Sequence, residues 1–223
     1  MNKKRKKAIP DEEFHVVAEL PGGLFFPALW SKVDNVVDCV TSLYRRFVGV
    51  SVDDAVNVYC NKVRAAQLRG DHEEAVVALK KLVGIKPKDS EIHYALGLNY
   101  EKMSNAEDAV ESYQNVIKLK PKHAEAYLRL GIIFSQLDAD KEAIPYLERS
   151  VELSRDSSEA YFRLGMAYDK SKRYADAVSA YKKAIKIDPW FAKAYKSLGF
   201  TYDISGKHNE AVACFKKAIE LEE

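Results

Sequence analysis

Hydrophobic and small residues return at an interval of 34 residues over most of this chain, separated by polar and charged stretches. Each period holds a Leu-Gly pair, an aromatic residue three positions after the glycine and an alanine twelve positions after it. An interval of 34 is typical of stacked structural repeats and not of a catalytic motif. The pairs are Leu96-Gly97, Leu130-Gly131, Leu164-Gly165 and Leu198-Gly199.

This periodicity predicts that each repeat is a pair of antiparallel helices, which bury their apolar faces by stacking on neighbouring pairs. A glycine inside a helix costs about 1 kcal/mol relative to alanine. Four glycines at one register therefore indicate a close backbone approach between the paired helices.

The recurring aromatic, Leu, Gly, Ala and Pro positions resemble the tetratricopeptide repeat (TPR). The resemblance implies an all-α TPR solenoid of antiparallel helix pairs that forms a right-handed superhelix. The first repeat is divergent, because Lys62 and Val63 replace Leu-Gly, and Asp53 is the expected N-cap of its first helix. The five predicted repeats span residues 56–89, 90–123, 124–157, 158–191 and 192–223.

Composition narrows the function only a little. The chain has 47 % hydrophobic and 30 % charged residues and a formal net charge of +2, which gives no case for nucleic-acid binding. Cys39, Cys60 and Cys214 lie far apart without metal-ligand spacing, so we expect free thiols in a reducing compartment. No apolar run reaches the about 20 residues of a membrane span. The basic residues 3–7 are followed by Pro10 and acidic residues, which argues against a secretory signal.

The sequence offers no reaction centre. The carboxylate pairs at Asp53-Asp54, Glu73-Glu74 and Glu107-Asp108 fall at expected helix starts, where they favour the positive end of the helix dipole. The histidines are scattered, and none stands one helical turn from another His or Cys, as metal ligands on a helix would. We therefore expect no enzyme activity, no cofactor and no metal. The histidines are His15, His72, His93, His123 and His208.

Partner binding is the function that remains, and the repeat register predicts which residues line a concave groove. Positions 2, 5, 9 and 12 of each first helix form one stripe. The stripe is unusually apolar and edged by arginine and lysine, which suits an amphipathic helix, although tight stacking of first helices would bury part of it. The predicted groove set is Arg64, Tyr94, Leu98, Leu128, Arg129, Ile132, Phe162, Arg163, Met166, Lys193, Lys196 and Phe200.

Two arginines of the groove set suggest an acidic partner. Arg129 and Arg163 occupy equivalent positions one repeat apart, about 10 Å between packed helices, which would let them hold an acidic stretch together. They also match the arginine of the carboxylate clamp in chaperone-binding TPR proteins. Leu98, Ile132 and Met166 stand where that clamp needs asparagine, so we do not predict capture of a terminal carboxylate.

The segment before the repeats is the second feature. Residues 24–55 are predicted to hold an amphipathic helix, half of a repeat, after chain breakers that begin at Pro21. The apolar face of this helix has three possible binding sites. It can cap repeat one, or it can bind the groove of another copy, which is a heterologous contact that can propagate. The third is a membrane surface, but Asp34 and Asp38 disfavour binding to anionic lipid. Residues 1–23 are expected to be a flexible basic tail. The apolar face consists of Trp30, Val33, Val37, Val40, Tyr44 and Phe47.

An amphipathic half repeat followed by five TPR repeats resembles a magnetosome-associated family of TPR proteins, from about Leu24 to Glu223. The stretches Ser51 to Ala55, Ala143-Ile144-Pro145 and Phe162-Arg163-Leu164-Gly165 strengthen the resemblance. It implies a cytoplasmic, non-catalytic protein that associates peripherally with the magnetosome membrane and recruits other magnetosome-associated proteins. The resemblance also implies self-assembly, in which the N-terminal helix binds a groove of another copy.

Two classes of function stay open. One is a self-assembling scaffold on an organelle surface, and the other is a monomeric TPR adaptor that captures an amphipathic or acidic peptide in its groove. The scaffold requires assembly through the N-terminal helix, whereas the adaptor keeps that helix docked on its own repeats. Pro145, just beyond the first turn after an expected N-cap at Asp140, is either a tolerated bend or a pivot between the two halves of the stack.

Overall fold

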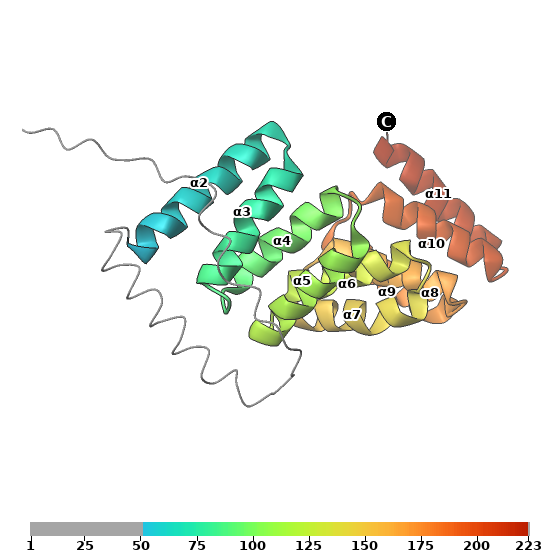
Figure 1. Ribbon diagram of the computed structural model, residues 1–223. Coiled ribbons are helices and arrows are strands. Elements are labelled where there is room, and N and C mark those ends of the chain that lie inside the picture. The colour runs from blue at the N-terminus through green and yellow to red at the C-terminus, as the bar shows by residue number, and fades with distance from the viewer. Residues whose placement is uncertain (1–50, 223) are drawn as a thin grey trace, which may run out of the picture. The chain divides into compact units, whose positions relative to one another are not determined.

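The computed structural model describes residues 51–222, in which ten α-helices follow one another without a strand. The expected all-α solenoid is confirmed, and Val52–Glu223 forms one unit (Figure 1). The predicted tail and the Trp30–Phe47 stretch lie outside the described residues. The helix pairs are α2 (Val52–Arg69) with α3 (His72–Ile85), α4 (Ser90–Lys102) with α5 (Ala106–Leu119), α6 (Ala124–Gln136) with α7 (Asp140–Leu153), α8 (Ser158–Lys170) with α9 (Tyr174–Ile187), and α10 (Ala192–Ile204) with α11 (His208–Glu222).

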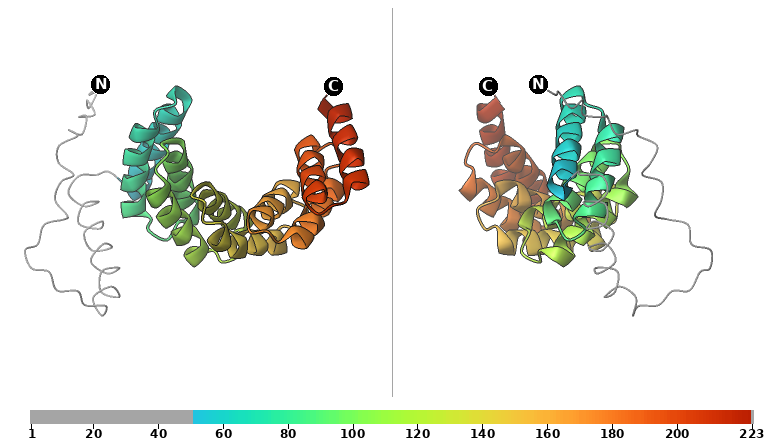
Figure 2. Two further views of the ribbon diagram at one scale, coloured as in Figure 1. Left: turned by 90° about the vertical axis from the view of Figure 1, so that its right-hand side faces the viewer. Right: turned by 60° about the vertical axis from the view of Figure 1, so that its left-hand side comes forward.

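The pairs stack because the second helix of each pair also packs on the first helix of the next. α3 contacts α4, α5 contacts α6, α7 contacts α8 and α9 contacts α10, which gives the curved stack of Figure 2. The first helix α8 also touches the neighbouring first helices α6 and α10 directly. The apolar faces between consecutive pairs are thereby covered, as a repeat stack requires.

The repeated glycines allow the two helices of a pair to pack closely. A Cβ placed on Gly97 would come within 2.6 Å of the Tyr113 ring, and one on Gly165 within 2.6 Å of the Tyr181 ring. The second helix therefore presses a large side chain against each glycine. The predicted close approach is real, but it is made by these side chains and not by the partner backbone.

The turn inside each pair repeats a left-handed backbone position that the sequence pattern did not reveal. Gly70 and Gly206 adopt φ of 70° and 75°, as glycine readily does. Ser104, Asp138 and Lys172 hold the equivalent turns at φ of 57°, 55° and 60°. These five positions keep the interval of 34 residues, so the turn geometry repeats although its residue type does not.

Helix starts are capped in most pairs, but two predicted caps were wrong. Asp71 accepts a hydrogen bond from the Glu74 amide at 2.9 Å, as an N-cap does. Helix α2 begins at Val52, so Asp53 lies in its first turn and not at the cap. Helix α7 includes Asp140 as its first residue, and the preceding Ala139 makes no side-chain cap bond.

Buried side chains form two hydrophobic clusters that divide within the third pair. Leu130 and Ile133 of α6 belong to the N-terminal cluster, whereas Leu128 of the same helix and Leu147 of α7 belong to the C-terminal one. Pro145 lies inside α7, beside this division. The pivot at Pro145 stays a prediction.

Candidate interaction surface

The apolar stripe of the predicted groove set is only partly accessible. Leu98, Ile132 and Met166 are half-buried, and Phe200 is 53 % exposed. Leu128 and Phe162 retain only 5 % and 7 % of their surface, so they belong to the core. The binding stripe is therefore narrower than the register alone suggests.

Direct packing of first helices explains the burial of Phe162. Helix α8 contacts both α6 and α10, and the Phe162 ring lies 4.9 Å from the ring of Phe191 at the start of α10. It also lies 5.9 Å from the Tyr181 ring. Tyr94 sits more openly, half-buried between the rings of His123 and Tyr113.

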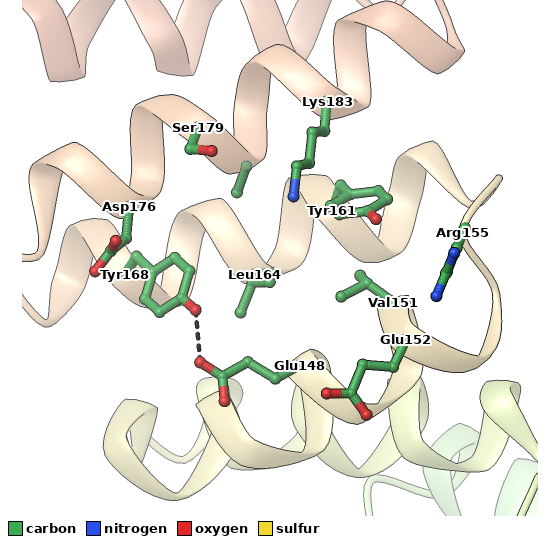
Figure 3. A pocket seen from close by; sticks show the side chains of 11 residues that line it. Glu148, Val151, Glu152, Arg155, Tyr161, Leu164, Tyr168, Asp176, Ser179 and Lys183 are labelled. Atoms are coloured by element: carbon green, nitrogen blue, oxygen red, sulfur yellow. Dashed lines mark hydrogen bonds between the residues drawn. The ribbon is translucent and has the colours of Figure 1, made fainter.

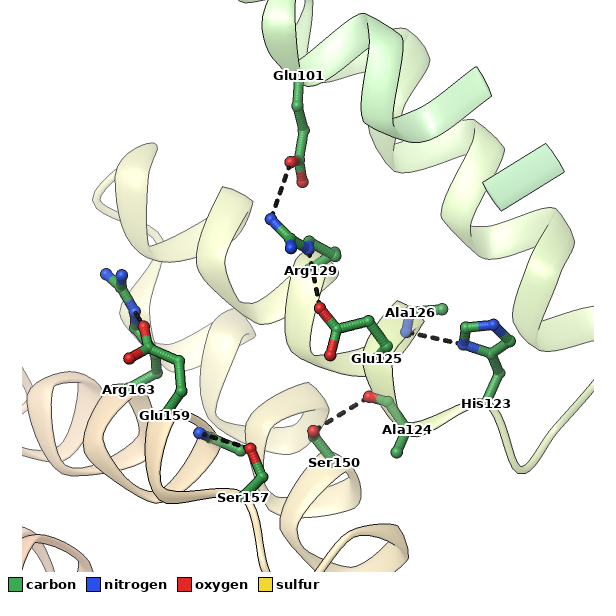
Figure 4. Close-up of polar contacts among 11 residues, drawn as sticks. Glu101, His123, Ala124, Glu125, Ala126, Arg129, Ser150, Ser157, Glu159 and Arg163 are labelled. Atoms are coloured by element: carbon green, nitrogen blue, oxygen red, sulfur yellow. Dashed lines mark hydrogen bonds and ion pairs between the residues drawn. The ribbon is translucent and has the colours of Figure 1, made fainter. Parts of the chain in front are cut away.

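The two arginines that we expected to hold an acidic partner already have carboxylates of their own (Figure 4). Arg129 donates to Glu125 at 3.1 Å and to Glu101 of the preceding repeat at 3.4 Å. Arg163 donates to Glu159 at 2.6 Å. An acidic partner must compete with these carboxylates. The Arg163–Glu159 pair is the more exposed of the two arrangements, and surface pairs contribute only about 0 to 1 kcal/mol, so a partner carboxylate can replace Glu159 at little cost.

The remaining cations of the groove set are exposed. Arg64, Lys193 and Lys196 all point their charge into water, on α2 and α10. The positive edge is therefore not one patch. It consists of half-buried, paired arginines in the middle repeats and exposed cations towards the two ends.

A polar connection between repeats was missed from the sequence. Asp169 of α8 accepts hydrogen bonds from the Tyr181 hydroxyl at 2.9 Å and from the Thr201 hydroxyl at 2.7 Å. Burial raises the pKa of the Asp169 carboxyl, and the two hydrogen bonds oppose this shift. The contact joins α8, α9 and α10, so it fixes the last repeat on the fourth.

The second repeat carries a related arrangement. Glu101 stands two repeats before Asp169 in register, and Tyr113 two repeats before Tyr181. Burial raises the pKa of Glu101, and the Arg129 charge opposes this shift. Burial and the Glu101 charge raise the pKa of Tyr113. An acid twelve residues before the tyrosine was the available sequence signal.

A hollow of about 420 Å³ lies outside the predicted groove, between α7, α8 and α9 (Figure 3). Val151, Leu164 and Ala180 give it an apolar base. At one end the Tyr168 hydroxyl donates to Glu148 at 2.6 Å. Lys183 places its Nζ 5.4 Å from the Tyr161 ring centroid. None of the groove-set residues lines this hollow, so sequence reasoning did not find it.

Other chemistry is sparse in the part of the chain that the structure describes. Between residues 51 and 222, no three His, Cys, Asp or Glu side chains gather as metal ligands would. None of the helices from α2 to α11 has the length and hydropathy that a membrane span requires. Cys60 and Cys214 are free thiols. Cys39 and the Trp30–Phe47 stretch lie outside the described residues.

Family models place the chain among known repeat proteins. Three tetratricopeptide-repeat models match it, one at residues 56–89, one at 94–158 and one at both 158–191 and 192–223. Comparison with curated protein sequences finds no match.

Comparison with solved structures shows which TPR proteins this chain resembles. A crystal structure of MamA is 36 % identical, covers 72 % of this chain and 94 % of its own, and superposes with a TM-score of 0.70. Residues 41 to the end of MamA from Desulfovibrio magneticus RS-1 are 31 % identical, covering 76 % and 96 %, with a TM-score of 0.72. YrrB, a TPR protein with an unusual peptide-binding site, shares the fold at 24 % identity, 73 % and 84 % coverage and a TM-score of 0.65.

The helix pairs, the glycine register and these comparisons all identify the same repeat type. The chain is a protein-interaction scaffold built from TPR repeats. It belongs to the MamA family of TPR proteins.

Proposed function

We propose that this chain is a non-catalytic scaffold that self-assembles and recruits partner proteins to the cytoplasmic face of the magnetosome membrane, where it is held peripherally. The observation that carries the proposal is the likeness to MamA, which extends over 94 % of one MamA structure and 96 % of another. A repeat stack presents a long surface for its mass, which suits a platform for other magnetosome-associated proteins.

Self-assembly is attributed to the predicted amphipathic helix within residues 24–55. A single amphipathic helix must cover its apolar face, and a second copy is one way to do so. A contact between two different surfaces of the same protein is heterologous, so it need not close and can extend into large assemblies. The groove set is one candidate receptor for this helix.

A monomeric adaptor is the second candidate function, and the first-helix stripe favours it. Leu98, Ile132 and Met166 give a half-exposed apolar stripe that an amphipathic peptide can cover. Arg129 and Arg163 flank it, with side chains 35 % and 37 % exposed. Acidic residues of the peptide would replace the intramolecular carboxylates.

Fractionation tests the location. In magnetosomes purified from cells that express the full chain, we expect the chain on the particles and its release by a high-salt or alkaline wash, as for a peripheral protein. A chain without residues 1–50 should be largely absent from the particles. Recovery of the full chain only in the soluble fraction would contradict the magnetosome proposal.

A further inference from the structure

The hollow between α7, α8 and α9 lies where the fourth pair lacks a side chain that the third pair has. In the third pair, Tyr146 of α7 stacks on Phe134 of α6, with the ring centroids 5.3 Å apart and an angle of 4° between the planes. The equivalent residues 34 positions later are Ala180 and Tyr168, and both line the hollow. Because the methyl group of Ala180 is much smaller than a tyrosine ring, the space that Tyr146 fills in the third pair stays open in the fourth.

The fifth pair also has a small residue at this position, Cys214, but its tyrosine is covered in another way. The ammonium group of Lys182, from the preceding pair, lies over the Tyr202 ring, 5.7 Å from the centroid. The equivalent of Lys182 beside the hollow is Glu148, which accepts a hydrogen bond from the Tyr168 hydroxyl at 2.6 Å instead of covering the ring. The second pair repeats the lysine arrangement, with Lys80 over Tyr100.

The three acids that line the hollow are already engaged by side chains of this chain. Each accepts a hydrogen bond: Glu148 from Tyr168 at 2.6 Å, Glu152 from Arg149 at 2.7 Å and Asp176 from Arg173 at 2.8 Å. The Arg173 guanidinium also lies 4.3 Å from the centroid of the Tyr168 ring, and Arg173 itself does not line the hollow. The acids are therefore neutralised locally and leave the two cations of the lining to set its attraction for a ligand.

Those two cations, Arg155 and Lys183, have no carboxylate partner among residues 51–222. Arg155 lies in the turn between α7 and α8, where the other turns between pairs hold proline. The carboxylate of Glu152, one helical turn earlier, pairs with Arg149 instead. Figure 3 shows Arg155, Lys183 and Tyr161 at the same end of the hollow. This end is positively charged and adjoins the apolar base.

We propose that the hollow binds a segment of a partner protein in which an aromatic residue lies close to acidic residues. The aromatic side chain would lie on the apolar base, in the space that Tyr146 fills one repeat earlier. A neighbouring carboxylate would then meet Arg155 and Lys183. The inference deepens the proposed recruitment of partner proteins, because it adds a binding site whose lining shares no residue with the groove set.

Fluorescence anisotropy with the full chain tests the inference. The probe is a short labelled peptide with one phenylalanine between two aspartates, and the matched peptides carry alanine for the phenylalanine or asparagine for the aspartates. Ala180→Tyr, which restores the side chain of the third pair, should weaken binding of the probe by at least about tenfold, because it fills the hollow. Arg155→Pro with Lys183→Gln should weaken binding by about two- to tenfold. Lys186→Gln is the matched control, since Lys186 is exposed on α9 outside the hollow.

The outcomes separate the hollow from the groove set and from the scaffold. Circular dichroism and the melting temperature show whether each variant folds, and the cation variant tests the site if Ala180→Tyr does not fold. Wild-type affinity in the folded hollow variants would overturn the inference, as would a wild-type chain that does not bind the probe. If Arg129→Glu with Arg163→Glu loses the probe while the hollow variants keep it, the site is the groove set. Fractionation of magnetosomes measures the location of the chain separately, so failure of this inference leaves the scaffold proposal standing.

Discussion

The hydroxyl of Tyr181 donates a 2.9 Å hydrogen bond to Asp169, across the two helices of the fourth pair. The same carboxyl oxygen accepts from Thr201 on the first helix of the fifth pair. One partly buried acid thus ties the last repeat to the stack. Ser135 and Leu147 stand at the equivalent positions of the third pair, so this acid–tyrosine contact is absent there.

The partly buried Asp169 should make the stability of the fold depend on pH. Because burial raises the pKa of Asp169 above its ordinary 3.8, the folded state binds a proton more readily than the unfolded state. The contribution of Asp169 to stability is therefore largest below pH 3.8 and is lost as pH rises through its folded pKa. We expect Asp169→Asn to gain stability relative to the wild type as pH rises from about 4 to about 7, measured by urea unfolding.

A control separates this effect from a general loss of charge. Asp156 is exposed in the turn before α8, where it accepts a hydrogen bond from the Ser154 hydroxyl, and Asp156→Asn should keep the wild-type fall in stability. A constant difference in stability between Asp169→Asn and the wild type at all pH values would contradict the role of the partly buried carboxyl.

Two glycines should respond in opposite ways to alanine. A methyl group on Gly165 meets the Tyr181 ring within 2.6 Å, so Gly165→Ala should destabilise the fold by about 1 to 3 kcal/mol. A methyl group on Gly84 would meet no neighbouring atom within 4 Å. Gly84→Ala should therefore stabilise α3 by up to about 1 kcal/mol. Denaturant unfolding gives both values. Equal effects would show that packing against Tyr181 is unimportant.

The turn before α9 offers a stabilising change. Lys172 holds a φ of 60°, a conformation that costs a residue with a side chain about 1 to 2 kcal/mol. Lys172→Gly should therefore stabilise the protein by about 0.5 to 1 kcal/mol, after the greater flexibility of glycine in the unfolded chain is subtracted. Gly206→Ala, at the equivalent turn, should act in the opposite direction. A lower melting temperature for Lys172→Gly than for the wild type would refute this reasoning.

Charge reversal tests the groove set. Arg129→Glu with Arg163→Glu should abolish binding of an acidic amphipathic peptide, because both positive charges of the stripe are reversed. Since Arg129 also pairs with Glu101 and Glu125, circular dichroism must show that the double variant keeps its helicity. Fluorescence anisotropy of a labelled acidic helical peptide measures this. Leu130→Ala is the contrasting variant: Leu130 is fully buried, so it should cost about 2 to 5 kcal/mol of stability and act only through unfolding. Undiminished binding by the double variant would place the peptide site elsewhere.

The repeat pattern predicted the helix pairs because glycine and its large partner side chain must meet in every repeat, as Gly97 does with Tyr113. The accessibility of the stripe was less predictable. Phe162 is buried because α8 touches α10, and that spacing depends on the curvature of the whole stack. The hydrogen bond from Thr201 to Asp169 joins residues of different repeats, so no short sequence motif predicts it. The left-handed turns could not be predicted from the sequence, because Ser104, Asp138 and Lys172 share no residue type.

The absolute mass in solution tests the central claim most directly. Light scattering should compare the full chain with a version that begins at Ser51, over a wide range of concentrations. The account predicts large assemblies for the full chain and single chains for the shortened one, because the segment before the repeats makes the contact between copies. If both versions stay monomeric at every concentration, the self-assembling scaffold is contradicted and the monomeric adaptor takes its place.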